Sequence, residues 1–236
     1  STRFMRGVDS KGRWRTPFNP RSSNHRNDDY CEGTAWQWTW FVPHDIEGLV
    51  ALMGGKDAFS EKLDSLFTVS SKLEGELVSS DISGLIGQYA HGNEPSHHIL
   101  HMYNYIDQPW KTQALVDSVL HSQYFNAPAG ISGNEDCGQM SAWYILNSMG
   151  FYQVCPGKPV YSIGRPLFDE TTLNLSDGKT FTIRTNNNSS ENKYIQAARL
   201  NGNPLTEPFF THEDIVAGGI LEFDMGSTPS KWGVKQ

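Results

Sequence analysis

The sequence is poor in cysteine and contains no long apolar run. Its three cysteines, Cys31, Cys137 and Cys155, are too few and odd in number for a disulfide framework, so buried thiols are expected. Because no stretch of about 18 consecutive apolar residues occurs, no membrane span is expected. The formal net charge of −7 argues against nucleic acid or an anionic membrane surface as a partner.

Aromatic residues are abundant by contrast. The 236 residues include 12 Phe, 9 Tyr and 7 Trp, enough to bury a core in one large domain or in two small ones. Aromatic faces also stack on pyranose rings, so this composition suits a sugar-binding protein as well as an ordinary aromatic core.

The stretch Gly133-Asn134-Glu135-Asp136-Cys137-Gly138-Gln139 stands in front of an apolar helix that is expected to end at Met149. Asp136 is predicted to cap this helix, with Gln139 in the capping-box position three residues later. Because the helix is apolar on most sides, we expect it to be buried, with its first turn facing the interior or a cleft. One predicted face comprises Ala142, Ile145, Leu146 and Met149; a second comprises Met140, Trp143 and Tyr144. An acidic cap without a catalytic role is the alternative.

Three tryptophans alternate in the stretch Tyr30–Val42. The alternation favours a strand, but the residues before Pro43 fit a short buried helix equally well. Glu32 enters this aromatic stretch, and a carboxyl in such surroundings has a raised pKa, which suits a general acid. A hydrogen-bonded structural glutamate is the alternative.

Further helices are predicted at residues 45–53, 56–67, 95–105 and 109–120. Asn93 and Glu94 place oxygen ligands just before the third of these, with Pro95 as its first residue. His97 and His98 are not expected to hold zinc together, because adjacent helical residues point about 100° apart. Packing and substrate contact are the two open roles for these histidines.

Polar clusters therefore precede three hydrophobic helices: Glu32, Asn93-Glu94 and Asn134-Glu135-Asp136. An α/α barrel builds its cleft in this way, from paired helices with the chemistry at one set of helix ends. Carboxylate and amide oxygens suit calcium better than zinc.

The two ends of the chain lack the helical pattern of the central part. Residues 1–29 form a long irregular loop in our interpretation. After Gly150, short alternating runs at 160–163, 171–175, 180–184, 194–200 and 220–225 predict antiparallel strands. Asp177-Gly178 and Asn201-Gly202 are hairpin signals.

Three motifs in this order resemble glycoside hydrolase family 92, and the resemblance runs from about Phe4 to the end of the chain. The motifs are Glu32-Gly33-Thr34-Ala35-Trp36-Gln37 with Trp40-Phe41-Val42-Pro43-His44-Asp45, then Gly92-Asn93-Glu94-Pro95-Ser96-His97-His98, and Gly133-Asn134-Glu135-Asp136-Cys137-Gly138-Gln139-Met140-Ser141-Ala142-Trp143. The resemblance implies a mainly α fold: part of an (α/α)6 catalytic barrel at residues 1–150, followed by an antiparallel β region at 151–236.

The resemblance also implies roles for particular residues. Glu32 corresponds to the general acid and Asp136 to the general base, while Asn134 stands where family members often have a second Asp. Calcium is the implied cofactor, with Asn93, Glu94 and Asp136 as its ligands. The residues expected to contact substrate are Trp36, Gln37, His97 and His98.

The function that follows is an inverting, calcium-dependent exo-α-mannosidase acting on terminal α-linked mannose of mannosides or N-glycans, with α-1,2 as the expected linkage. The expected location is extracytoplasmic, either periplasmic or secreted. A non-catalytic carbohydrate-binding fragment and a structural calcium-binding helical protein are the alternatives.

The family's N-terminal β-sandwich and first barrel helices are not in this sequence, so they are the expected structural partners. Without them, apolar faces such as Phe59-Leu63-Leu66 lose part of their cover. Burial contributes about 25 cal/mol per Å², and net stabilities are only about 5–15 kcal/mol. The chain is therefore predicted to be stable only beside the rest of its barrel.

Overall fold

The computed structural model describes residues 2–176 and 178–235 and divides the chain into two compact units. The first unit comprises Ser1–Ile99 and Phe125–Met140, and the second comprises Leu100–Tyr124 and Ser141–Gln236. Helices make up 28% of the structure and strands 23%, so the fold is mixed rather than mainly α, with the β region at the C-terminal end as predicted. None of the described helices combines the length and apolar character that a membrane crossing needs.

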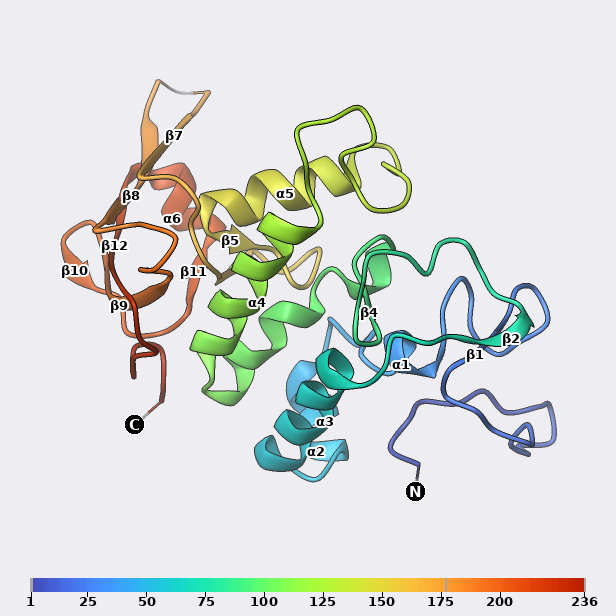
Figure 1. Ribbon diagram of the computed structural model, residues 1–236. Helices are drawn as coiled ribbons and strands as arrows, with labels where there is room; N and C mark the ends of the chain where they lie inside the picture. Colours follow the sequence, from blue (N-terminus) through green and yellow to red (C-terminus); the bar gives the residue numbers. More distant parts are fainter. Residues whose placement is uncertain (1, 177, 236) are drawn as a thin grey trace. The chain divides into compact units, whose positions relative to one another are not determined.

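The first unit contains little regular structure (Figure 1). Its irregular N-terminal segment leads to strand β1 (Ser22–Asn24), which pairs in parallel with β2 (Glu74–Leu77). Helices α1 (Ala35–Trp38), α2 (Ile46–Leu52) and α3 (Lys56–Thr68) follow the segment. Two short strands, β3 (Leu85–Ile86) and β4 (Tyr89–Ala90), then lead to a 3-10 turn, η1 (Glu94–Ser96). The long loop and both α2 and α3 are confirmed.

The tryptophan-rich stretch is a helix rather than a strand. The Thr34 hydroxyl accepts a hydrogen bond from the Trp36 amide at 3.2 Å, and the Gln37 side-chain oxygen accepts one from the Thr34 amide at 2.7 Å. This reciprocal pair is a capping box, which fixes the start of α1.

The single helix predicted at 95–105 is wrong, because η1 is followed by a second 3-10 helix, η2 (Ile99–Ile106). A 3-10 helix repeats every three residues, so Leu100, Tyr103 and Ile106 share one side, and all three are buried. The His97 side chain hydrogen-bonds to the His91 carbonyl and the His98 side chain to the distant Trp40 carbonyl, and these contacts outweigh the helical pattern of the sequence.

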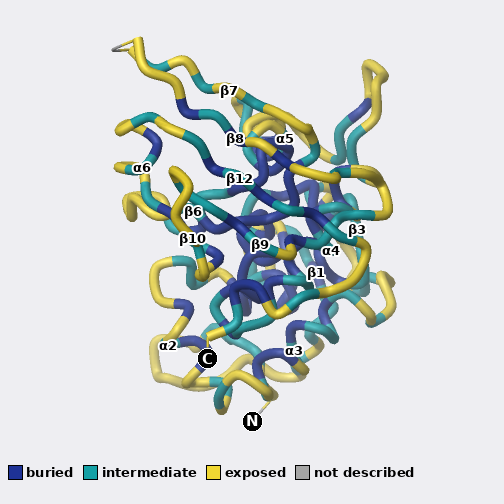
Figure 2. The backbone as a smooth tube through the Cα atoms, turned by 90° about the vertical axis from the view of Figure 1, so that its left-hand side faces the viewer, coloured by how far each residue is buried: buried dark blue, intermediate teal, exposed yellow. Residues whose placement is uncertain are grey.

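The second unit is built on two sheets. The five-stranded sheet has the order β10-β9-β12-β8-β7 and the three-stranded sheet the order β11-β6-β5. The strands are β5 (Phe151–Tyr152), β6 (Val160–Ile163), β7 (Glu170–Asn174), β8 (Thr180–Asn186), β9 (Tyr194–Leu200), β10 (Asn203–Pro204), β11 (Phe209–Thr211) and β12 (Gly219–Gly226). Burial alternates along β8 and β12, so one face of the sheet covers an apolar core (Figure 2).

The expectation of a purely antiparallel β region is wrong at one pair, since β12 runs parallel to β8. Sequence reasoning also missed helix α6 (His212–Ala217), which Thr211 and Asp214 start with a second capping box. The Asn201-Gly202 hairpin is confirmed, with φ values of 51° and 79° at the two turn residues. Asp177, in the other predicted turn, lies outside the described residues.

Helix α4 (Pro109–Ser122) starts at its proline as expected and packs against β9, where the Gln113 side chain accepts a hydrogen bond from the Ile195 amide at 2.9 Å. Helix α5 (Gln139–Met149) differs from the prediction at its start and in its faces. Its first residue is Gln139, so Asp136 lies in the preceding turn. The predicted stripe is wrong in part, because Ala142 and Ile145 are exposed.

The buried face of α5 is instead defined by aromatic and polar contacts within the second unit. Trp143 stacks on Tyr124 with ring centroids 5.9 Å apart, and Asn147 hydrogen-bonds to His101 at 2.9 Å. The polar residue Asn147 thus lies on the buried face of α5, and a pattern of apolar residues cannot predict this. The expectation of buried thiols is also wrong: Cys31 and Cys137 are exposed, and Cys155 is half-buried.

Candidate active site

The predicted acid, Glu32, lies in a turn just before the Thr34 cap of α1. Its φ of 50° is in the left-handed region, which side chains other than glycine rarely adopt. The Trp38 indole N–H donates to the carbonyl oxygen of Cys31 at 2.7 Å, and the Asn93 amide donates to the carbonyl oxygen of Glu32 at 2.9 Å. The carboxyl is exposed, so this structure does not provide the aromatic burial expected for it.

The predicted base, Asp136, has the same unusual backbone. Asp136 and Cys137 have φ values of 49° and 58° in the turn that leads into α5. Further back in this loop, Gly133 lies so close to Gly92 that an added Cβ would meet the Gly92 carbonyl oxygen at 2.5 Å. The loop of Asp136 is therefore packed directly on the loop that carries Asn93 and Glu94.

The three acidic residues converge at Glu94, which is half-buried. Burial is the main cause that raises the pKa of Glu94 above its ordinary value. The Asp136 carboxylate raises it further through charge and a side-chain hydrogen bond, and the charge of Glu32 adds to the effect. Glu94 therefore interacts with both Asp136 and Glu32, so acidic residues from three different motifs lie near one another.

Neighbouring carboxylates at a half-buried position repel one another, so such a site favours either a bound proton or a bound cation. Oxygen donors of this kind fit calcium in their chemistry. Among residues 2–176 and 178–235, however, no three His, Cys, Asp or Glu side chains converge closely enough to hold a metal by themselves. Asn93 has turned its amide nitrogen to the Glu32 carbonyl, which leaves its side-chain oxygen as the atom suited to a cation.

The two predicted substrate-contacting histidines are almost fully buried in the first unit, at 1% exposure for His97 and 4% for His98. Gln139 contacts His97 Nδ1 at 3.1 Å, while His97 Nε2 lies 3.0 Å from the His91 carbonyl oxygen. His98 Nε2 lies 2.8 Å from the Trp40 carbonyl oxygen. Burial lowers the pKa of both rings to about 4, so both are neutral at pH 7.

Trp36 and Gln37 are also enclosed in the first unit. The Trp36 ring meets Phe4 edge-on at 4.9 Å, and the Gln37 amide donates to the Gln88 carbonyl at 2.6 Å. The roles of Trp36, Gln37, His97 and His98 in substrate contact stay predictions.

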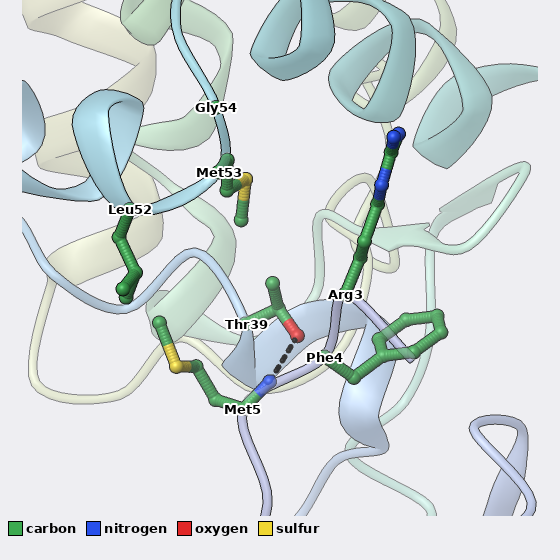
Figure 3. Close-up of a pocket in the computed structure, with 7 residues that line it drawn as sticks. All are labelled: Arg3, Phe4, Met5, Thr39, Leu52, Met53 and Gly54. Carbon is green, nitrogen blue, oxygen red and sulfur yellow. Dashed lines mark hydrogen bonds between the residues drawn. The ribbon is translucent and has the colours of Figure 1, made fainter. Parts of the chain in front are cut away.

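The first unit also has a cavity of about 380 Å³ whose lining contains none of the predicted site residues, although its Phe4 packs against Trp36 (Figure 3). The Met5 amide donates to the Thr39 hydroxyl at 3.2 Å at its edge. Its lining is mostly apolar: Arg3, Phe4, Met5, Thr39, Leu52, Met53 and Gly54. Sequence reasoning gave no sign of it, because the residues come from separate segments without a motif.

Sequence reasoning also missed the supports of the site, namely the Trp38 and Asn93 hydrogen bonds and the close approach of Gly92 and Gly133. The only available signal was the presence of a glycine in each motif, which can mark a close backbone approach.

Comparisons with known proteins show the family of the chain. Residues 1–227 match the glycosyl hydrolase family 92 catalytic domain. The structure superposes on a family GH92 α-mannosidase of Bacteroides thetaiotaomicron, solved with mannoimidazole, with a TM-score of 0.91 and 40% identity over 98% of this chain. A family GH92 inverting mannosidase of the same bacterium gives a TM-score of 0.84 and 40% identity over 98% of the chain. The chain therefore belongs to glycosyl hydrolase family 92.

The match covers only part of each relative. An uncharacterised secreted glycosidase of Arthroderma benhamiae is 33% identical over 218 residues, which is 91% of this chain and 26% of that protein. The two mannosidases are covered over 31% and 32% of their chains. The chain thus spans between a quarter and a third of the length of these relatives.

Proposed function

We propose that the protein carrying this chain is an inverting exo-α-mannosidase in which Glu32 is the general acid and Asp136 the general base. The observation that carries the proposal is that the three motif loops lie together: Asn93, next to Glu94, donates to the Glu32 carbonyl, and the loop of Asp136 packs on Gly92. The left-handed backbone at both predicted catalytic carboxyls supports it, because such strain gathers at functional sites.

The chemistry assigns a different protonation state to each carboxyl. Glu32 would hold a proton on its carboxyl and deliver it to the leaving glycosidic oxygen. Asp136 would stay ionised and draw a proton from a water molecule on the opposite face of the sugar. Inversion requires room for this water, so the two carboxyls should stand about 6.5–9.5 Å apart when substrate is bound.

The proposed cofactor is calcium, held by the side-chain oxygens of Asn93, Glu94 and Asp136. When bound, it would supply positive charge that can coordinate neighbouring sugar hydroxyls. The chain's own contribution is a half-buried carboxyl at Glu94, whose pKa is raised mainly by burial and further by the charges of Asp136 and Glu32. In this proposal Trp36, Gln37, His97 and His98 shape and support the sugar site.

The proposed substrate is terminal α-linked mannose of mannosides or N-glycans, with α-1,2 as the first linkage to test. The mannosidase relatives support this substrate class, and the secreted glycosidase relative supports an extracytoplasmic location. The remaining part of an (α/α)6 barrel and a β-sandwich are the proposed structural partners, in line with the partial coverage of the relatives.

The test uses the complete natural polypeptide with 4-nitrophenyl α-mannoside and α-1,2-mannobiose. Hydrolysis of both is expected. Mannose binding by calorimetry without hydrolysis would favour the non-catalytic alternative, and neither binding nor hydrolysis would favour a structural role.

Calcium is tested by measuring the bound metal directly, by elemental analysis after dialysis, as well as by activity in a chelator. Glu94→Gln should lose bound calcium, whereas Glu135→Gln, an exposed carboxyl next to Asp136, should retain it. Full activity in excess chelator, or unchanged metal content in Glu94→Gln, would contradict the proposed site.

A further inference from the structure

The turn that carries Glu32 is held at two consecutive carbonyl groups. The Trp38 indole donates to the carbonyl of residue 31 at 2.7 Å, and Asn93 donates to that of residue 32 at 2.9 Å. Glu32 lies between these two points with a φ of 50°. A left-handed residue persists only where its surroundings over-determine it, and these two hydrogen bonds meet that condition.

The indole ring is also fixed in position by what lies beside it. A Cβ on Gly33 would lie 2.6 Å from Trp38 Nε1 and 2.7 Å from the adjacent ring carbon. The ring therefore occupies the space that any larger residue at position 33 would need. Trp38 also packs edge-on against Phe41, with ring centroids 5.2 Å apart.

The Trp38 contact is the more informative of the two, because Asn93 is also a proposed calcium ligand. Trp38 contributes one N–H group and no charge, and its hydrogen bond reaches the residue before Glu32, whereas that of Asn93 reaches Glu32 itself. Its removal therefore changes the direction of the Glu32 turn without changing the acidic residues of the site.

We infer that Trp38 is a positioning residue for the general acid: its indole N–H, seated against Gly33, holds the Cys31 carbonyl and so directs the Glu32 carboxyl. This inference rests on the proposed function, because it assigns an effect on proton delivery to the leaving group. It predicts a defect that depends on how much the leaving group needs a proton.

The experiment compares two substrates in the complete natural polypeptide. Hydrolysis of 2,4-dinitrophenyl α-mannoside needs little protonation, whereas α-1,2-mannobiose needs the acid fully. Trp38→Phe keeps an aromatic ring and removes the N–H. It should lower kcat roughly tenfold on mannobiose, the size expected for one hydrogen bond, and less than about twofold on the dinitrophenyl substrate.

A second variant tests the same geometry from the other side. Gly33→Ala should push the indole off the carbonyl and produce the same substrate-dependent loss. In the double variant the smaller phenyl ring leaves room for the new methyl group, so the two losses should not add. Trp14→Phe, at a position that is 56% exposed in the N-terminal segment, is the matched control and should leave both rates unchanged.

The outcomes distinguish failure of the proposed mannosidase function from failure of the role assigned to Trp38. A wild-type protein that hydrolyses neither substrate overturns the proposed function and this inference with it. An active wild type whose Trp38→Phe variant loses both rates equally, or loses neither, overturns the inference alone. Thermal unfolding of each variant identifies a general loss of folding, which would lower both rates together.

Discussion

The two units of the chain reach order by different means. The second unit has a five-stranded sheet over a core that includes Ile183, Phe181 and Phe223, with burial alternating along its strands. The first unit has helices of four to 13 residues joined by long irregular segments, and side-chain hydrogen bonds hold the turn of Glu32. All of the predicted catalytic and metal-binding residues lie in the first unit.

This contrast shows where precision and stability come from in this chain. Repeated backbone pairing and apolar burial stabilise the second unit, and many residues each contribute to its stability. In the first unit, two side-chain hydrogen bonds hold the left-handed turn of Glu32, and the loop of Asp136 packs on Gly92. We therefore expect substitutions at the site to affect chemistry more than folding, and substitutions in the sheet core to do the reverse.

The largest effect is expected at the proposed acid. Glu32→Gln in the complete polypeptide should lower kcat on α-1,2-mannobiose by about 10²–10⁴-fold, because the variant cannot deliver a proton. Its melting temperature should stay close to that of the wild type, since the side chain is exposed. Steady-state kinetics and calorimetry measure the two quantities, and a large drop in melting temperature would contradict the contrast between the units.

A core substitution in the second unit should show the opposite pattern. Phe223 is fully buried, so Phe223→Ala should cost about 3–5 kcal/mol of unfolding free energy. Phe168→Ala is the matched control, because Phe168 is 49% exposed and should cost much less. Denaturant unfolding gives both values, and equal losses would show that the sheet core does not carry the stability assigned to it.

Acid should affect the two units in different pH ranges. Burial lowers the pKa of His98 from 6.5 to about 4, so its neutral form stabilises the fold above pH 6.5 and this stability is lost as the pH falls towards 4. The loss is on the order of 3 kcal/mol. In the second unit, hydrogen bonds from Asn186 and Arg199 lower the pKa of Asp224 below 3.8, so its contribution is lost only below that pH.

Hydrogen exchange at stepwise lower pH can measure this difference unit by unit. Amides of the first unit should lose protection between pH 6.5 and 4, and His98→Gln should reduce that loss. Simultaneous loss of protection in both units at one pH would contradict the assignment.

The smallest change in stability is expected at two N-cap residues, each part of a capping box of the same type. Thr34→Ala at α1 and Thr211→Ala at α6 should each cost about 1 kcal/mol of stability. Only Thr34→Ala should also lower kcat, because α1 carries Trp38, which holds the turn of Glu32. Equal catalytic losses from both variants would show that the α1 cap has no special link to the site.

The sequence predicted most where local pattern decides the structure. Alternation located strands β8, β9 and β12, and Asn201-Gly202 located a hairpin, because period and turn chemistry are local properties. The parallel pairing of β12 with β8 joins distant segments, so no local pattern reports it.

The same limit applies to the candidate site. The motifs located the acidic residues, and the structure brings Glu32, Glu94 and Asp136 together. The left-handed conformation of Glu32 is held by hydrogen bonds from the Trp38 and Asn93 side chains, which the sequence pattern does not report. The 3-10 geometry after Glu94 likewise depends on contacts of buried histidines, which override the helical pattern.

The assignment of Glu32 as acid and Asp136 as base is tested most directly by the anomer released first. Proton NMR of α-1,2-mannobiose hydrolysis by the complete polypeptide should show β-mannose appearing before mutarotation, with Asp136→Asn slowing its release by about 10²-fold or more. Initial release of α-mannose, or an undiminished rate in Asp136→Asn, would contradict the account.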